Sequence, residues 1–302
     1  MLCQSTNRGI CVLAPAKLNL FLRIVAKRTD GFHDIESVMA SVNLYDTLTF
    51  EPLSTDDIEL AVVDASPRSQ SGELKSEAPA GPTNLVVRAA NLLKEYAGCC
   101  QGARISLIKR IPSSAGLGGG SSDCAAALGA LNRLWGLRVS QGELMELAGR
   151  LGSDVPFFLG KSPLALCTGR GELIEPFRVS TALHFVIAKP SSGLSTPAVY
   201  RICEPDRTNQ SAERFLKSIQ GGQICEMARR LHNGLQAPAE TLSSDVRRLR
   251  SLFEQESVVG HQMSGSGSSY FGVCRSRRHA MGVASRLRSA GIPWVRIVRS
   301  SP

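Results

Sequence analysis

Apolar and polar residues alternate along residues 11–24. A period of two is typical of a β-strand with one face in the core, so we predict a strand here that carries Lys17 and Asn19 on one face. The dipeptide Asp-Gly that follows favours a turn, which places Phe32 and His33 on a loop. Taken alone, Phe32 fits a core residue and His33 fits a surface histidine.

The rest of the N-terminal half alternates between strand and helix patterns. Residues 38–50 predict two strands separated by a break at 43–46, and residues 58–63 predict a short strand. The stretch from there to residue 82 is rich in Ser, Pro, Asp, Glu and Gly, so we interpret it as a mobile surface loop without chemistry. A helix over 84–93 and a strand over 103–108 follow.

The segment 112–123 contains four glycines within five positions. Glycine adds no side chain to a core and costs backbone entropy, so these glycines must serve the shape of the backbone. The helical spacing of Cys124, Leu128, Leu131 and Trp135 predicts a helix directly after them. The first turn of a helix presents unpaired N–H groups and a positive dipole end, which glycines let an anion approach closely. We therefore predict a phosphate site.

This loop matches neither of the two common phosphate motifs. A Walker loop needs Lys and then Ser or Thr after its last glycine, whereas Ser121 and Ser122 follow here, and a dinucleotide loop needs a glycine at position 121. The alternative interpretation is a glycine-rich turn capped by Ser121 or Ser122. The hydroxyls favour the phosphate site, because such a serine can bind a phosphate oxygen or a magnesium ion.

The C-terminal half contributes an acid and a second glycine-rich loop. A capping-box pattern at 140–143 opens a helix that ends at Gly152. Asp154 follows beside an apolar run and is either a helix cap or a functional carboxylate. Residues 263–268 form the second glycine-rich loop, a weak signal by itself, and a strand is predicted over 294–298.

Length and composition set the class of protein. At 302 residues the chain exceeds what one hydrophobic core usually supports, so two lobes are expected. The sequence has no run of ~18 apolar residues and no apolar signal segment at residues 1–8, which predicts a cytoplasmic protein with no membrane partner. The nine cysteines form no Cys-x-x-Cys pair, so we interpret them as reduced thiols rather than disulfides or zinc ligands.

The formal net charge of +9 has two interpretations. Seven arginines between positions 275 and 299 are compatible with a nucleic-acid surface. However, no long basic run occurs, and aromatic residues make up 5% of the chain, too few to interleave as stacking platforms. We therefore expect no nucleic-acid partner and attribute the basic balance to small anionic substrates.

Five motifs occur in one order between Ala14 and Cys274. The motifs are Pro15-Ala16-Lys17-Leu18-Asn19-Leu20, Asp30-Gly31-Phe32-His33, the segment 112–122, Leu151-Gly152-Ser153-Asp154-Val155-Pro156-Phe157, and Met263-Ser264-Gly265-Ser266-Gly267. Together they resemble the GHMP kinase superfamily. The first two resemble the branch that phosphorylates the 2-hydroxyl of 4-diphosphocytidyl-2-C-methyl-D-erythritol with ATP in the non-mevalonate isoprenoid pathway.

The resemblance implies catalytic and ATP-binding residues. Asp154 would take the proton of the substrate hydroxyl, while Lys17 would hold the carboxylate ionised and orient the acceptor. Asn84, Leu85 and Lys109 would lie on the adenosine side of ATP, and Mg²⁺ would lie near Ser121 or Ser122. The phosphates of ATP would bind Pro112, Ser113, Ser114, Ala115, Gly116, Leu117, Gly118, Gly119, Gly120, Ser121 and Ser122.

The resemblance also implies a substrate site. Asn19 would bind the diol of the acceptor, and Phe32 and Tyr200 would sandwich the cytosine. His33 would hydrogen-bond that base. The predicted set is completed by Thr196 and Pro197, which stand in the same segment as Tyr200.

The fold implied by the resemblance is α+β in two lobes. The N-terminal ATP-binding lobe, 1–166, would resemble domain 2 of ribosomal protein S5, and the C-terminal lobe, 167–302, would be ferredoxin-like. ATP and the small-molecule substrate would meet between the lobes of a monomer or weak homodimer. The alternatives are another GHMP kinase, acting on mevalonate or homoserine, and an RNA-binding protein with an S5-like lobe.

Some positions depart from the family pattern. Phe32 stands where tyrosine is common and keeps the stacking face. Asp123 stands where asparagine is common and adds negative charge near the phosphates, which is expected to weaken ATP binding slightly. The segment Asn233-Gly234-Leu235-Gln236 replaces Asn-Asp-Leu-Glu, and we assign it no role.

Overall fold

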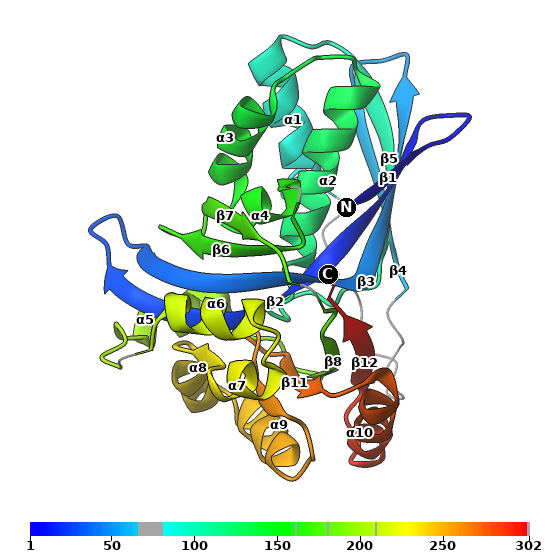
Figure 1. Ribbon diagram of the computed structural model, residues 1–302. Helices are drawn as coiled ribbons and strands as arrows, with labels where there is room; N and C mark the ends of the chain where they lie inside the picture. The colour runs from blue at the N-terminus through cyan, green and yellow to red at the C-terminus, as the bar shows by residue number, and fades with distance from the viewer. Residues whose placement is uncertain (66–80, 161, 180, 209, 301–302) are drawn as a thin grey trace.

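Two long antiparallel strands, β2 (Ile10–Lys27) and β3 (His33–Leu53), run through both halves of the molecule. In the computed structural model they belong to the N-terminal sheet and extend across the top of the C-terminal lobe (Figure 1). This arrangement confirms the predicted two-lobed α+β fold. The structure describes residues 1–65, 81–160, 162–179, 181–208 and 210–300, so most of the loop predicted up to residue 82 lies outside the described residues.

The N-terminal sheet has the strand order β1-β2-β3-β5-β4, with β6 and β7 continuing from β3 and β9 beside β2. Its pairs are antiparallel except β4 with β5 and β9 with β2, which are parallel. The remaining strands of this sheet are β1 (Leu2–Ser5), β4 (Ile58–Asp64), β5 (Gly102–Lys109), β6 (Leu164–Thr168), β7 (Leu173–Phe177) and β9 (His232–Asn233).

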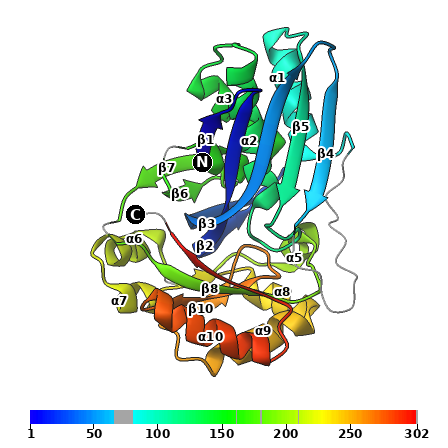
Figure 2. The ribbon, with the colours of Figure 1, turned by 90° about the vertical axis from the view of Figure 1, so that its right-hand side faces the viewer.

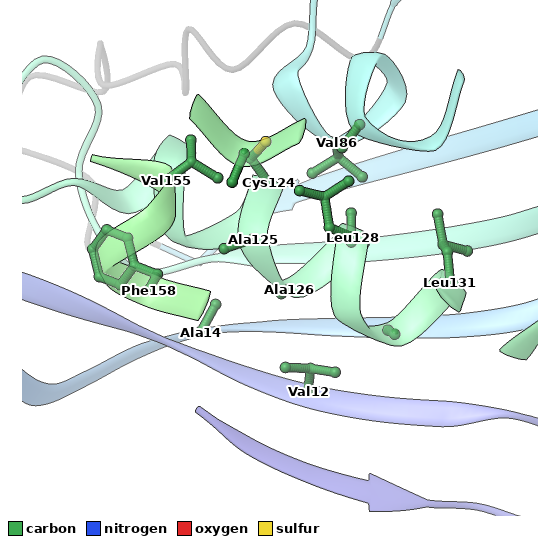
Figure 3. Close-up of a cluster of buried hydrophobic side chains, with 14 of the residues drawn as sticks. Val12, Ala14, Val86, Cys124, Ala125, Ala126, Leu128, Leu131, Val155 and Phe158 are labelled. Atoms are coloured by element: carbon green, nitrogen blue, oxygen red, sulfur yellow. The ribbon is translucent and has the colours of Figure 1, made fainter. Parts of the chain in front are cut away.

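Helices α1, α2 and α3 lie on one face of this sheet (Figure 2). The predicted apolar face of α2 is buried, and Cys124, Leu128 and Leu131 pack with Val86 of α1 and Val12 of β2 in one core (Figure 3). The glycines just before α2 and in its first turn are therefore positioned by a well-packed helix. The bounds are α1 (Leu85–Ala97), α2 (Gly119–Leu134), α3 (Gln141–Leu151) and α4 (Val155–Leu159).

The predicted break at 43–46 is wrong, because β3 is continuous over 21 residues. The register against β2 shifts there instead: Tyr45 pairs with Pro15, whereas Val42 pairs with Ala16. Two residues of β3 thus bulge out of the ladder. The bulge explains the irregular polar pattern without a loop, and Asp46 lies directly after it as a fully buried residue.

The C-terminal lobe is built on an antiparallel sheet of order β10-β11-β8-β12. One face, with Phe185 and Ile187 of β8, packs against β2 and β3. The other face, with Val186 and Ala188, packs against α9 and α10. The bounds are β8 (His184–Lys189), β10 (Gly260–Met263), β11 (Tyr270–Cys274), β12 (Trp294–Arg299), α5 (Thr196–Ile202), α6 (Ala212–Gln220), α7 (Ile224–Arg229), α8 (Gln236–Leu242), α9 (Ser244–Glu254) and α10 (Arg277–Ser289).

The boundary predicted between residues 166 and 167 falls inside β6, which pairs with β3 and β7 in the N-terminal sheet. We propose to place it between β7 and β8, where the chain passes to the second sheet. Within the ranges described, none of the helices has the length and apolar character of a membrane span.

Candidate active site

A cavity of about 970 Å³ holds nearly the whole predicted site. Among the described residues, Ser122 is the one predicted site residue that does not line it, because Ser122 is fully buried. The predicted residues that do line the cavity are Lys17, Asn19, Phe32, His33, Asn84, Leu85, Lys109, Pro112, Ser113, Ser114, Ala115, Gly116, Leu117, Gly118, Gly119, Gly120, Ser121, Asp154, Thr196, Pro197 and Tyr200.

The glycine-rich loop presents the N-terminus of α2 to this cavity. Gly118 is the N-cap of α2, with φ of 70°, and no side chain caps the helix. The alternative of a turn capped by Ser121 or Ser122 is therefore wrong. Because residues of the first turn have no intrahelical partner for their N–H groups, Gly119, Gly120 and Ser121 offer donors to an anion.

Lys17 and Asp154 meet beside that helix N-terminus. Lys17 Nζ lies 3.5 Å from Asp154 Oδ2, and the Lys17 side chain is 4% exposed, whereas the Asp154 side chain is 30% exposed. Asp154 is the N-cap residue of α4, but its side chain makes no capping hydrogen bond. Of the two interpretations, a carboxylate open to the cavity thus fits better than a helix cap.

The Lys17 side chain is held by its own strand and by the glycine loop. Its ammonium donates a hydrogen bond to Asn19 Oδ1, and its backbone N–H donates to Leu117 O at 2.9 Å. Asn19 Nδ2 in turn donates to Ser37 Oγ at 2.8 Å on β3. These contacts fix Lys17 and Asn19 next to each other, as their shared face predicted, and tie β2 to the loop.

A second lysine, Lys109, forms a buried cluster with two acids. Lys109 Nζ donates to Asp46 Oδ2 and to Asp123 Oδ2, the latter at 2.7 Å. Burial alone would lower the pKa of Lys109, but the carboxylates outweigh it and raise that pKa. Burial raises the pKa of Asp123 to about 7, against the lowering influence of Lys109. The negative charge that the sequence analysis expected near the phosphates at Asp123 is thus in contact with the Lys109 ammonium.

Sequence reasoning missed Asp46, which holds this cluster to the loop. Asp46 Oδ1 accepts hydrogen bonds from the backbone N–H groups of Arg110 and Ile111, the latter at 2.8 Å. The cluster thus joins β3, the end of β5 and the first turns of α2. Little signal for this role was available in the sequence, because Asp46 fell within the predicted break at 43–46, where an exposed aspartate would be ordinary.

Three aromatic residues, Phe32, His33 and Tyr200, also line the cavity. The rings of His33 and Tyr200 lie 5.3 Å apart between centroids. Phe32 is 49% exposed, and the guanidinium of Arg170, which the sequence analysis did not single out, lies 4.8 Å from its ring centroid. Burial lowers the pKa of His33, and Lys27 lowers it further, so the imidazole is neutral at pH 7.

The second glycine loop, treated as a weak signal, packs on the first. Ser264 Oγ donates to Gly116 O at 3.0 Å, and Ser269 N donates to Ala115 O at 3.2 Å. A Cβ atom on Gly116 would lie 2.0 Å from Ser264 O, which explains the glycine there. Gly265 and Ser266 also line the cavity.

The segment 233–236, to which we assigned no role, supports this second loop. Asn233 Nδ2 donates to Met263 O at 2.8 Å and to Gly265 O at 2.9 Å. A Cβ atom on Gly234 would lie 2.5 Å from Asp206 Oδ2. The Asp206 carboxylate accepts from Ile24 N at 3.0 Å, so it occupies the space that a larger residue at 234 would need.

The residues present fit a magnesium ion bound together with a nucleotide. In the described parts of the chain, no three His, Cys, Asp or Glu side chains gather as a metal site. A nucleotide-bound magnesium needs no such group, because phosphates and water supply most of its ligands. Ser121 lines the cavity and suits this role, whereas the buried Ser122 Oγ lies away from the lining.

The comparisons with known proteins agree with this geometry. The family described as the GHMP kinases N terminal domain matches residues 84–161, and the family described as GHMP kinases C terminal matches residues 212–293. Crystal structures of a homoserine kinase from Cytophaga hutchinsonii and of a mevalonate kinase from L. major share the fold, each with a TM-score of 0.74 at 18% and 14% identity. Both lobes are thus those of a GHMP-type small-molecule kinase.

Relatives with higher sequence identity show which family of GHMP kinases the chain belongs to. A 4-diphosphocytidyl-2-C-methyl-D-erythritol kinase from Pelotomaculum thermopropionicum is 40% identical over 92% of this chain and 94% of its own length. One from a Nocardioides species is 38% identical over 93% and 94%. A crystal structure of a kinase with the same substrate in its name matches at a TM-score of 0.78, with 34% identity over 97% of this chain and all of that one. The chain belongs to the 4-diphosphocytidyl-2-C-methyl-D-erythritol kinase family.

Proposed function

We propose that this protein transfers the γ-phosphoryl group of ATP to the 2-hydroxyl of 4-diphosphocytidyl-2-C-methyl-D-erythritol, a step of non-mevalonate isoprenoid biosynthesis. The observation that carries the mechanism is the Lys17–Asp154 pair, 3.5 Å apart, in the cavity that the N-terminus of α2 enters. The family relationship supports both the reaction and the acceptor.

The chemistry assigns one task to each side chain. The 2-hydroxyl oxygen attacks the γ-phosphorus, the bond from that phosphorus to the β–γ bridging oxygen breaks, and ADP leaves. Asp154 receives the hydroxyl proton, and the Lys17 ammonium offsets the repulsion between the Asp154 carboxylate and the phosphates. The N–H groups of the first turn of α2 hold the phosphates, because phosphoryl transfer depends chiefly on positioning and charge neutralisation.

Magnesium completes the proposed site. When bound, it neutralises charge on the phosphates of ATP. Ser121 is the residue of this chain that we assign to hold it, since Ser121 lines the cavity in the first turn of α2.

The cavity suits two anionic nucleotides. Its volume of about 970 Å³ lies near the upper end of the range for small-molecule sites, roughly 300–1,000 Å³. Within the described residues its lining carries five cationic and two acidic side chains, which favours anionic ligands. The cations are Lys17, Lys27, Lys109, Arg170 and Arg201, and the acids are Asp123 and Asp154.

The aromatic end of the cavity separates this function from its nearest alternatives. Phe32, His33 and Tyr200 line it, whereas mevalonate and homoserine contain no base to stack. A coupled ADP-release assay with Mg²⁺ and ATP should therefore give turnover with the cytidine-linked methylerythritol and none with mevalonate or homoserine. Turnover with either of the latter instead would overturn the proposed acceptor.

An RNA-binding function is the second candidate, because the chain is basic overall. RNA binding would give the Lys17–Asp154 pair no role, and this disfavours an RNA-binding function. If the assay gave no turnover with any acceptor in folded protein, titration with RNA at several salt concentrations would test it. Affinity that falls steeply with salt would support RNA binding.

We assign the working form to a monomer or weak homodimer in the cytoplasm. All nine cysteines are free thiols, as expected for a reducing compartment. Sedimentation at several protein concentrations, with and without substrates, checks the oligomeric state. Sedimentation as a tight dimer or a larger assembly at every protein concentration would contradict this assignment.

Phe32→Ala tests the aromatic end directly. We expect the substrate KM to rise and kcat to stay nearly unchanged, because alanine removes the stacking on the base. By analogy with other aromatic platforms for bases, this stacking is worth roughly 1–3 kcal/mol of binding free energy. Steady-state kinetics with the cytidine-linked substrate measures this. A KM equal to that of the wild type would remove Phe32 from the site.

A further inference from the structure

Within the described parts of the chain, the imidazole of His33 hydrogen-bonds one side chain, the thiol of Cys203. His33 Nε2 lies 3.6 Å from Cys203 Sγ, and both residues are buried, at 6% and 8% exposed. Cys203 directly follows α5, the helix that also carries Tyr200 against the His33 ring. The catalytic scheme above gives Cys203 no task.

The Cys203 thiol has a single proton, and this proton is not directed at His33. Sγ lies 3.3 Å from the backbone oxygen of Tyr200. That carbonyl stands in the last turn of α5, where helix carbonyls lack a backbone donor, and a carbonyl can only accept. The S–H therefore points to Tyr200 O, and the sulfur offers Nε2 a lone pair. Burial raises the pKa of the Cys203 thiol, which keeps this proton in place.

We propose that Cys203 fixes the tautomer of His33, with the proton on Nε2 and with Nδ1 as a hydrogen-bond acceptor, so that the site selects a base bearing an amino group. The inference rests on the proposed function, because it makes His33 the residue that reads the base. A neutral imidazole carries one proton, so a hydrogen bond donated by one ring nitrogen leaves the other as an acceptor. Donation from Nε2 to Cys203 therefore leaves Nδ1 as the acceptor. Cys203 is a positioning residue, since it acts through His33.

The tautomer decides between two pyrimidines. Cytosine carries an amino donor at the position where uracil carries a carbonyl acceptor. An Nδ1 acceptor pairs with the amino group, whereas against the carbonyl it leaves two acceptors facing each other. Sites built to hydrogen-bond one group reject an analogue that leaves a buried polar group unpaired. The His33–Cys203 pair therefore favours a cytidine-linked substrate over its uridine-linked counterpart.

Nitrogen NMR of the full chain labelled with ¹⁵N-histidine tests the tautomer without any turnover. The His33 signals are assigned by their absence in His33→Gln. The wild type is expected to show a protonated Nε2 and an unprotonated Nδ1. Cys203→Ala should shift His33 toward a mixture of tautomers, whereas Cys203→Ser, which can still donate to Tyr200 O and accept from Nε2, should keep the wild-type pattern. A proton on Nδ1 in the wild type overturns the proposal.

The ratio of kcat/KM for the cytidine-linked and uridine-linked substrates tests the selectivity. Cys203→Ala should lower this ratio about tenfold through the KM of the cytidine-linked substrate, with kcat within about twofold of the wild type. Cys274→Ala, a truncation of another buried cysteine of the C-terminal lobe outside the cavity lining, should leave the ratio unchanged. A wild-type ratio in folded Cys203→Ala contradicts the proposal. Absence of wild-type turnover with the cytidine-linked substrate would instead refute the proposed function, and the tautomer would still be decided by NMR.

Discussion

Two lysine–aspartate clusters of opposite character lie at the cavity, each with a lysine and an aspartate in its lining. Lys17 and Asp154 lie 3.5 Å apart, and the Asp154 carboxylate is 30% exposed toward the cavity. Lys109 instead donates to Asp46 and Asp123, whose side chains are 0% and 3% exposed. The same two residue types thus form an open pair in one place and a closed cluster in the other.

The difference lies in how many partners each charge has. The Asp154 carboxylate makes no capping hydrogen bond and keeps capacity to accept a proton. The Asp46 carboxylate accepts from Lys109 and from two backbone N–H groups, so its capacity is used to join β3 to the loop. A buried charge with several partners stabilises geometry, whereas a partly exposed charge with one partner can take part in chemistry.

Asp154→Asn breaks the open pair and should have the largest effect. Without a base for the substrate proton, kcat should fall by about two to four decades, while ATP affinity stays close to that of the wild type. The melting temperature should change little, because the side chain caps no helix. ADP-release kinetics, nucleotide titration and thermal unfolding measure the three quantities. Near-wild-type turnover would remove Asp154 from the mechanism.

Lys109→Met breaks the closed cluster and should reduce stability instead. It leaves two buried carboxylates without their cation, which typically costs about 3–5 kcal/mol in the free energy of unfolding. Denaturant unfolding measures it. Lys217→Met is the matched control, because the pair of Lys217 with Glu213 is 74% exposed on both sides, and removal of such a pair costs about 0–1 kcal/mol. Equal effects of the two changes would mean that burial does not separate the clusters.

Local sequence signals predicted several elements of the fold and the position of the phosphate loop, whereas the two-lobe arrangement and the roles of most site residues were predicted only through the family resemblance. The apolar face of Cys124, Leu128 and Leu131 predicted α2, and the glycines before it predicted the loop that enters the cavity. Period-two alternation placed Lys17 and Asn19 side by side. These features need only neighbouring residues, so the sequence displays them directly.

The remaining features depend on contacts between distant segments. Asp46 and Lys109 stand 63 positions apart, and nothing in either local pattern pairs them. The bulge of β3 is defined by its register against β2, so it looked like a break in the sequence alone. The second glycine loop acquires a role through its packing on the first, which the residues 263–268 do not encode by themselves.

Gly118→Val probes the helix N-terminus that lies between the two clusters. A Cβ atom at Gly118 would lie 3.0 Å from Lys17 Cγ and 2.9 Å from Phe158 Cζ, and φ is +70°. We expect ATP affinity to fall at least about a hundredfold, because the new side chain would displace Lys17 and Phe158 and, with them, the backbone that receives the phosphates. Gly136→Val is the control, since Gly136 has φ of +63° but open space around it. This control separates the effect of backbone strain from the effect of displacing Lys17 and Phe158. Unchanged ATP affinity in folded Gly118→Val would contradict the phosphate site.

Asp123→Asn makes in the closed cluster the same change that Asp154→Asn makes in the open pair, and it should have the smallest effect. The amide oxygen can still accept from Lys109, while Asp46 still neutralises the ammonium. The free energy of unfolding should therefore stay within about 1 kcal/mol of the wild type, as for removal of one neutralised partner. The KM for ATP should change less than about twofold, because the Asp123 charge lies against Lys109. A clear fall in that KM would mean that Asp123 repels the phosphates despite Lys109. The closed cluster would then act on ATP directly, and the distinction between the two clusters would be one of degree.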